Sequence, residues 1–185
     1  MTDEEPKRED FEILKSSNLP SNLSFKIIII GDSGVGKTCL SERATKGTFT
    51  GILAPTVGFD FYSLLVKYKD KLIKLEIWDT CGQEAYRSLI TSYYKHCYLA
   101  IIVYATNKYN FFFHIFYSKK SFQNIPEWIR QCRENSEPNI KLILIGNKND
   151  LDEDEYIFIF NVFIGGKLKQ TKEKKLKIIM KWNYS

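Results

Sequence analysis

Eight consecutive residues of this chain have the types and the spacing needed to bind a phosphate group. Glycines permit backbone conformations that other residues avoid, so that successive amides can converge on phosphate oxygens. A helix that begins at such a turn adds the positive end of its dipole. The lysine can then reach the outer phosphates, and the following hydroxyl can bind Mg²⁺. The residues are Gly31, Asp32, Ser33, Gly34, Val35, Gly36, Lys37 and Thr38, directly after the apolar run 25–30.

We call residues 31–38 the phosphate loop. The alternative interpretation is an ordinary glycine turn before a helix. A buried strand, a glycine-rich turn and a helix opening on Lys-Thr are the context that makes this pattern a phosphate site. The sequence supplies all three in order, so we favour the phosphate-binding interpretation.

Strands must position these residues, and the sequence predicts several. Apolar runs and alternating patterns predict strands at 25–30, 57–66, 71–78, 98–104 and 140–145 and helices at 39–46 and 120–135, with Pro126 as an irregularity. The second and third of these strands are joined closely enough to form an antiparallel hairpin. The alternation of strands and helices predicts an α/β fold with a doubly wound, mostly parallel sheet.

Composition limits the classes of protein to consider. The 185 residues are enough for one domain, and 44% hydrophobic and 26% charged residues are ordinary for a soluble globular chain. The net charge is +5, and residues 165–185 carry seven lysines against one glutamate. Such a run can favour anionic membranes or nucleic acid. We prefer a solvated basic tail and expect no nucleic-acid partner. Residues 1–24 are expected to form a mobile N-terminal extension.

Cysteines and terminal signals predict a cytoplasmic protein. The four cysteines have no metal-type spacing, which is typical of reduced thiols; they are Cys39, Cys81, Cys97 and Cys132. No apolar run is long enough to span a bilayer, and no signal peptide is present. Thr2 follows Met1 and no cysteine lies near Ser185, so we expect neither N-myristoylation nor prenylation of this chain.

Two further motifs follow the phosphate loop, each at the predicted end of a strand. They are Trp-Asp-Thr-Cys-Gly-Gln-Glu at 78–84 and Asn-Lys-Asn-Asp at 147–150. Open α/β sheets bind ligands at the carboxyl ends of their strands, so the three motifs are expected to form one site.

Together with Pro55-Thr56-Val57-Gly58, these motifs closely resemble the Ras-superfamily small GTPases. Residues 76–79 (Glu-Ile-Trp-Asp) and 86–90 (Tyr-Arg-Ser-Leu-Ile) fit the Rab branch best. The resemblance covers about residues 25–150, which we assign as a GTP-binding G-domain of the P-loop NTPase class.

The resemblance implies a role for each motif residue. Lys37 would pair with the phosphates, Gln83 would place the attacking water, and Thr56 would close over Mg²⁺ and the γ-phosphate. Thr38, Thr56 and Asp79 would hold the metal. The implied nucleotide contacts are Asp32, Ser33, Gly34, Val35, Gly36, Lys37, Thr38, Cys39, Phe49, Thr56, Gly82, Asn147, Lys148 and Asp150.

Base recognition is implied for Asn147, Lys148 and Asp150, with Phe49 lying on the base. A carboxylate is a pair of acceptors that suits the N1–H and 2-amino donors of guanine, and such sites reject an unmatched base by about 10⁴ or more. The alternatives are a simple turn at Asn147-Lys148 and a core aromatic at Phe49.

Four departures from the family pattern are visible. Cys81 stands where alanine is usual, and Leu53 where many Rab proteins have tyrosine. Residues 109–117 form an atypical insertion in which six of nine side chains are aromatic. After Asp150 the basic tail 151–185 lacks the family's last strand, with its guanine contact, and its final helix. The run 156–164 has strand composition but follows too closely for a parallel crossover.

Both atypical segments are rich in Phe, Ile, Tyr and Asn, and each begins with Tyr after Lys108 or Glu155. Our hypothesis is that they are translated introns. A reverse-transcribed message that contains both segments would contradict it.

The resemblance implies a GTP/GDP switch that regulates vesicle trafficking on the cytosolic face of endomembranes. Hydrolysis of GTP would be slow, and weaker still without the guanine-contact module. Exchange factors, GTPase-activating proteins and effectors would bind through residues 49–58 and 80–94. The alternatives are a nucleotide-binding scaffold without turnover and an ATP-using P-loop enzyme, against which the motif at 147–150 argues.

Overall fold

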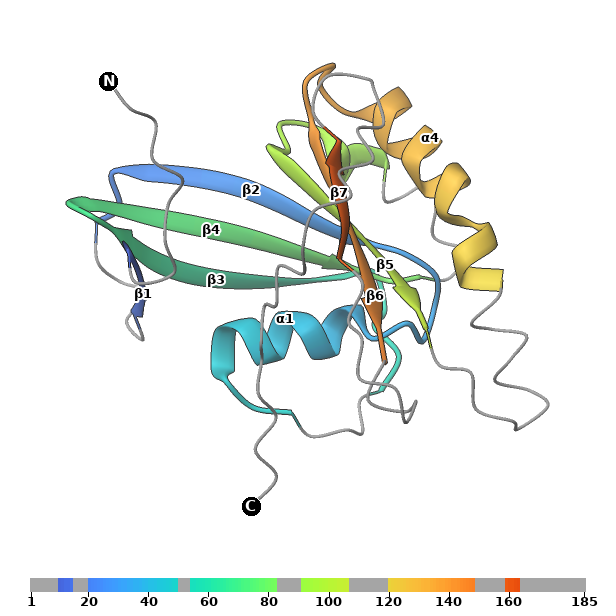
Figure 1. Cartoon of the computed structure of the whole chain (residues 1–185), viewed down its shortest axis with the longest axis horizontal. Coiled ribbons are helices and arrows are strands. Elements are labelled where there is room, and N and C mark those ends of the chain that lie inside the picture. Colours follow the sequence, from blue (N-terminus) through green and yellow to red (C-terminus); the bar gives the residue numbers. More distant parts are fainter. Residues whose placement is uncertain are drawn as a thin grey trace.

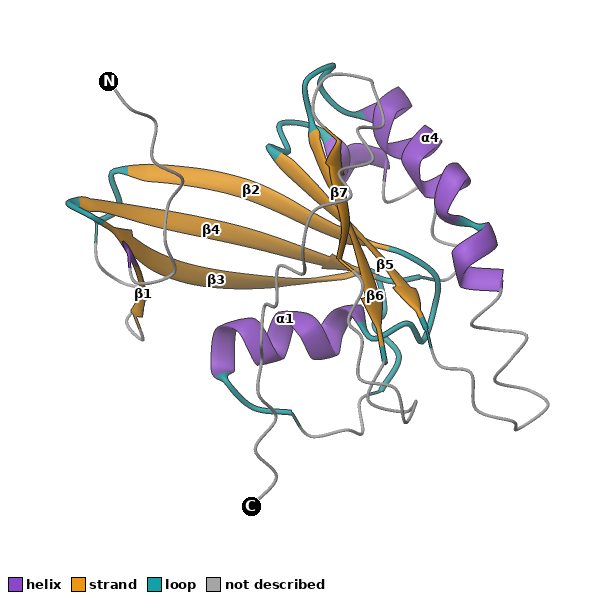
Figure 2. Ribbon diagram, viewed as in Figure 1, coloured by secondary structure: helices purple, strands orange, loops and turns teal. Residues whose placement is uncertain are grey.

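The computed structural model describes residues 10–14, 20–49, 54–82, 91–106, 120–148 and 159–163. Its centre is one seven-stranded sheet (Figures 1 and 2). In spatial order the strands are β1 (Phe11–Leu14), β3 (Phe59–Tyr68), β4 (Lys71–Thr80), β2 (Leu23–Ile30), β5 (Leu99–Ala105), β6 (Lys141–Asn147) and β7 (Ile159–Phe163). The helices are α1 (Lys37–Lys46), the 3₁₀ helix η3 (Thr91–Tyr94) and α4 (Ile125–Asn135).

The four central strands β4, β2, β5 and β6 are parallel to one another. β3 is antiparallel to β4, as expected of a hairpin, and β1 and β7 are antiparallel strands at the two edges. The predicted α/β fold with a largely parallel sheet is therefore confirmed.

Both faces of β2, in the middle of the sheet, are covered, which explains its continuous apolar sequence. Ile28 and Ile30 pack on one side in a core cluster with Trp128 and Cys132 of α4. Ile29 packs on the other side with residues that include Leu40 of α1. Helices on both faces are the arrangement that the sequence predicts.

The helix predicted over 120–135 is broken near its start. A first helical turn covers residues 120–123, Asn124 interrupts it, and α4 then begins at Ile125 with Pro126 in its first turn. Proline has no N–H to donate and is tolerated there. Phe122, in this first turn, is 58% exposed, and its ring lies edge-on against the ring of Tyr104.

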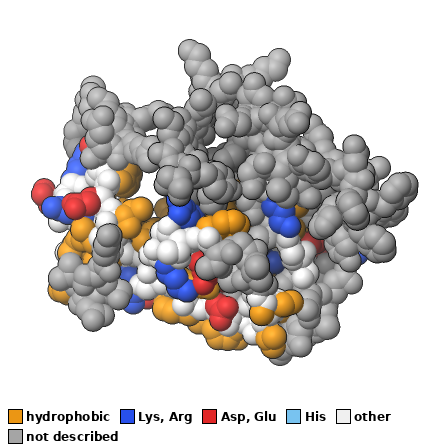
Figure 3. All heavy atoms as spheres, turned by 90° about the horizontal axis from the view of Figure 1, so that it is seen from below, with side chains coloured by type: hydrophobic (Ala, Val, Ile, Leu, Met, Phe, Trp, Pro, Cys, Tyr) orange, Lys and Arg blue, Asp and Glu red, His pale blue; other side chains and the backbone are white. Residues whose placement is uncertain are grey.

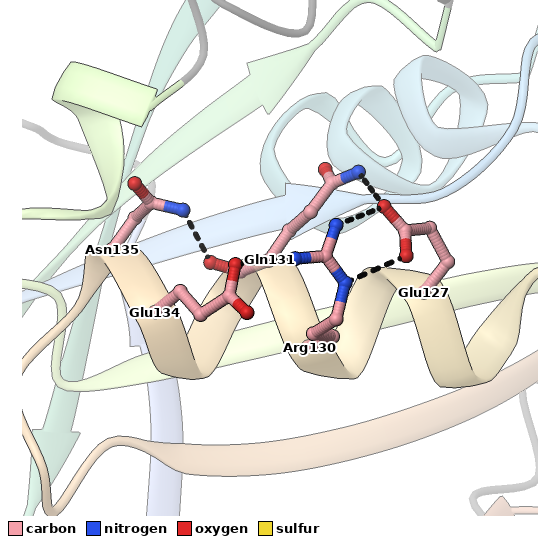
Figure 4. Close-up of polar contacts among 5 residues, drawn as sticks. All are labelled: Glu127, Arg130, Gln131, Glu134 and Asn135. Atoms are coloured by element: carbon pink, nitrogen blue, oxygen red, sulfur yellow. Dashed lines mark hydrogen bonds and ion pairs between the residues drawn. The ribbon is translucent and has the colours of Figure 1, made fainter.

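The outward face of α4 is polar, and its inward face packs against the sheet. Arg130 lies between Glu127 and Glu134 and donates hydrogen bonds to both (Figure 4). Gln131 also donates to Glu127, and the Asn135 amide donates to the Gln131 carbonyl. The ion pairs of Arg130 with Glu127 and Glu134 are exposed, so they contribute little to stability.

The N-terminal extension predicted over 1–24 needs a correction. Phe11–Leu14 forms an edge strand, and β2 already begins at Leu23. This strand, β1, pairs antiparallel with β3, with Phe11 opposite Tyr68 and Ile13 opposite Val66. The ring of Phe11 stacks on that of Tyr68, with the ring centroids 4.7 Å apart. Tertiary pairing therefore orders a stretch whose composition alone indicated a mobile tail.

The run 156–164 does contain a strand, β7, beside β6. It is antiparallel, with Leu142 opposite Phe163 and Ile145 opposite Ile159. An antiparallel neighbour needs no long crossover, so the short connection is compatible with this pairing. The predicted insertion 109–117 and most of the basic tail lie outside the described residues.

Charged side chains of both signs are interspersed with hydrophobic ones on the face seen in Figure 3. Within the described residues, no helix has both the length and the hydropathy needed to cross a membrane.

Candidate functional site

The phosphate loop connects β2 to α1, so that Lys37 is the first residue of the helix. The Lys37 side chain is 5% exposed, and its Nζ donates to the carbonyl oxygens of Gly31 and Asp32, each at 2.8 Å. Burial lowers the pKa of the Lys37 ammonium to about 8, against the opposing effect of Asp79 and Asp32. An anion at this place would restore the charged form, because an opposite charge nearby favours it.

Position 36 requires glycine for two reasons, its backbone conformation and the closeness of a neighbouring side chain. It precedes α1 with φ 94°, in the left-handed region that side chains rarely adopt. A Cβ atom there would lie 2.3 Å from Nδ2 of Asn147. That Nδ2 donates to the carbonyl of Val35 at 2.8 Å, so the third motif is attached directly to the phosphate loop.

Three oxygen-bearing side chains meet at the start of α1. The hydroxyls of Thr38 and Thr56 are 2.8 Å apart, and Thr38 Oγ1 donates to Asp79 Oδ2 at 2.5 Å. Asp79 stands in β4, and Thr56 lies in the chain segment just before β3. The structure thus brings together the three residues that the sequence predicted as metal ligands.

The chemistry of these donors fits Mg²⁺. Oxygen ligands are the ones that this cation prefers, and it is commonly held by one or two protein carboxylates. Oδ1 of Asp79 is buried and has no hydrogen-bond partner among the described residues. Burial raises the pKa of Asp79 to about 6, although Thr38 and Lys37 act in the opposite direction. A cation would stabilise this carboxylate. The proposed metal set has one carboxylate and two hydroxyls. It therefore differs from a cluster of three or more His, Cys, Asp or Glu side chains, and no such cluster occurs among the described residues.

The second motif lies directly on the phosphate loop. A Cβ atom at Gly82 would approach the Asp32 carbonyl carbon and the Ser33 nitrogen to 2.3 Å, so only glycine fits. Cys81 is 2% exposed, and its N–H donates to the carbonyl of Gly58 at 3.0 Å. This bond ties the segment around Thr56 to the segment after Asp79.

The ends of β5 and β6 hold Asn147 in place. Thr106 donates to the Asn147 carbonyl twice, from its N–H at 2.8 Å and from its hydroxyl at 3.0 Å. Lys148 follows with φ 67°. Burial raises the pKa of the Cys39 thiol, and the charge of Lys148 opposes that rise.

Other predicted site residues have mixed outcomes. Phe49 is 46% exposed, so the alternative of a core aromatic is wrong. Gln83 and Asp150 lie outside the described residues. The sequence interpretation missed Thr106, and it also missed Asn124 and Trp128, which donate to the Asp32 carboxylate. Trp128 lies within the helix predicted over 120–135, and that prediction gave no sign of its contact with Asp32.

Comparison with known proteins identifies relatives of this chain. The Ras family model matches residues 26–175, and this match extends beyond the third motif, which ends at Asp150. Similar proteins include the Ras-related protein RAB1BV of Beta vulgaris, which is 40% identical over 70% of this chain and 56% of its own length. Rab-13 of Rattus norvegicus is 38% identical over 69% of this chain and 58% of its own. The GTP-binding protein yptV2 of Volvox carteri is 36% identical over 82% and 61%.

The chain spans a little over half the length of these relatives. The family model covers most of the chain, and the relatives that match it carry Rab or Ypt-type names. This chain therefore belongs to the Ras family, in its Rab branch.

Proposed function

We propose that the site binds GTP and GDP together with Mg²⁺ and acts as a slow GTPase switch. The observation that carries this proposal is the joining of Thr38, Thr56 and Asp79 at the end of the phosphate loop. In this arrangement the Thr56 segment closes over the place where metal and terminal phosphate would lie. Loss of the γ-phosphate would release that segment, which is how such switches signal.

Guanine recognition is assigned to Asn147, Lys148 and Asp150, with Phe49 beside the base. Support comes from the bond between the Asn147 side chain and the Val35 carbonyl, since it attaches the residue proposed to read the base to the phosphate loop. Gln83 is assigned to orient the attacking water, one residue after Gly82. The G-domain is assigned to residues 25–150.

The biological role that we propose is regulation of vesicle trafficking at the cytosolic face of endomembranes. The basis is the similarity of this chain to Ras-related Rab proteins such as RAB1BV and Rab-13. Exchange factors, GTPase-activating proteins and effectors would bind through residues 49–58 and 80–94. An activating protein that supplies an arginine raises hydrolysis by up to about 10⁵.

A single-turnover GTP hydrolysis assay tests the proposal, with Gln83→Leu as the comparison. Slow phosphate release that is lost in Gln83→Leu supports a switch. Tight GTP binding with no phosphate release from either protein would instead support a nucleotide-binding scaffold. Equal competition by ATP and GTP against a fluorescent GDP analogue would contradict the assignment of guanine.

A further inference from the structure

Asp32 is an unexpected residue inside a loop that binds phosphate. A carboxylate beside phosphate oxygens is unfavourable, because like charges repel. Here both carboxylate oxygens are directed to α4 and the turn before it. Asn124 Nδ2 donates to Oδ2 at 2.7 Å, and Trp128 Nε1 donates to Oδ1 at 2.8 Å. The negative charge is therefore satisfied away from the phosphate-binding amides.

The two donors are themselves held in place. Trp128 is 1% exposed and belongs to the core cluster between α4 and the sheet, so its indole N–H has a fixed position. Asn124 occupies the N-cap position of α4 but makes no side-chain capping bond. Asparagine is a favoured capping residue, and here its amide donates to Asp32 instead.

The backbone around Asp32 supports two other parts of the site. Its carbonyl accepts a hydrogen bond from Lys37 Nζ, and the link from Asp32 to Ser33 lies where any side chain at Gly82 would collide. A rotation of Asp32 would therefore displace the lysine that is proposed to bind phosphate and the surface on which Gly82 rests.

We propose that Asn124 and Trp128 are positioning residues that fix the phosphate loop through the Asp32 carboxylate, so that retention of the nucleotide depends on α4. The inference rests on the proposed function, because it concerns a nucleotide bound at the same loop. In this proposal neither residue contacts the nucleotide, and each acts by holding Asp32.

The test measures release of a fluorescent GDP analogue in excess unlabelled GDP from the full chain. The variants are Asp32→Ala, Trp128→Phe and the double variant. Hydrogen bonds to charged groups are among the stronger ones in proteins, so we expect each single change to speed release about threefold or more. The double variant should release no faster than Asp32→Ala, because residues that act through one interaction are not additive.

Cys132→Ala is the control. It removes a fully buried side chain of α4 from the same core cluster as Trp128, and the Cys132 thiol pairs with Ser136 and not with Asp32. Release from Cys132→Ala should stay at the wild-type rate even if its thermal stability falls as far as that of Trp128→Phe. Asn124→Ala provides a second variant outside the core, and Asp32→Asn should restore part of the retention because one oxygen acceptor remains.

Additive effects in the double variant would overturn the inference, as would wild-type release rates in both Trp128→Phe and Asn124→Ala. A wild-type chain that binds no GDP would contradict the proposed function itself, and the inference with it. The two failures are thus distinguished by whether the unmodified chain retains GDP.

Discussion

The side-chain amide of Asn147 donates to the main-chain carbonyl of Val35 at 2.8 Å. This bond joins the end of β6 to the turn between β2 and α1, two segments that are far apart in the sequence. The proposed base-binding and phosphate-binding parts of the site are therefore one connected unit. A change in either part is expected to alter affinity for the whole nucleotide.

Lys37→Ala should weaken GDP binding at least tenfold. The change removes a buried ammonium that lies within the phosphate loop and leaves concentrated phosphate charge poorly compensated. Equilibrium titration with a fluorescent GDP analogue measures the effect. Lys46→Ala serves as the control, since Lys46 is exposed at the other end of α1 and pairs with Glu42. Unchanged affinity in Lys37→Ala would mean that phosphate binds elsewhere.

Asp150→Asn should shift preference from guanine to xanthine nucleotides. The substitution replaces an acceptor by a donor, which opposes the 2-amino group of guanine but suits the 2-oxo group of xanthine. Competition of GTP and XTP for the same labelled nucleotide gives the ratio of affinities. Asp152→Asn is a matched control on a nearby carboxylate. If Asp150→Asn keeps the wild-type ratio, the base is read by other residues.

Gly82→Ala should slow GTP hydrolysis about tenfold or more, because displacements of about 1 Å near the reacting groups are costly. The added methyl group would overlap the backbone of Asp32 and Ser33 and push the second motif off the loop. GDP affinity should remain within about threefold of wild type, since the phosphate-binding amides are kept. Wild-type hydrolysis in single-turnover measurements would show that this contact is not part of the active arrangement.

Cys132→Ala should reveal a pH-dependent contribution to stability. Burial raises the pKa of the Cys132 thiol from 9.0 to about 12, while Ser136 and Arg133 oppose the rise and Cys97 adds to it. Above pH 9 the unfolded chain loses this proton and the folded chain keeps it. The free energy of unfolding of the wild type therefore falls with pH relative to the variant.

The difference in unfolding free energy between wild type and Cys132→Ala should narrow by about 1.4 kcal/mol per pH unit above pH 9. Urea denaturation at pH 8 and pH 10 measures it, and all other titrating groups cancel in the comparison. A difference that stays constant between these two pH values would mean that the folded protein does not hold Cys132 protonated.

The central strands and the motif residues could be predicted from sequence because their signals are local. The run at 25–30 lies within β2, and the alternating runs at 57–66 and 71–78 became the hairpin of β3 and β4. A Lys-Thr pair after a glycine-rich turn indicates phosphate binding even where the fold is not known. The meeting of Thr38, Thr56 and Asp79 followed from a family resemblance, not from spacing alone.

The rest depended on tertiary contacts that no local pattern records. β1 is a short stretch in a polar segment, and only its pairing with β3 makes it a strand. The bonds from Asn124 and Trp128 to Asp32 connect residues more than ninety positions apart. The antiparallel direction of β7 could have been predicted from the sequence, because the short connection before it excludes a parallel crossover.

The edge strand β1 also affects the order in which the chain folds. Its four residues pair with Leu65–Tyr68, which lie far later in the sequence, so a long loop must close before a few hydrogen bonds form. Closing such a loop costs chain entropy that the short ladder offsets only weakly. β1 is therefore expected to join the sheet last and to leave it first, as the least cooperative part of the domain. Amide protons of residues 11–14 should exchange with solvent long before those of β2.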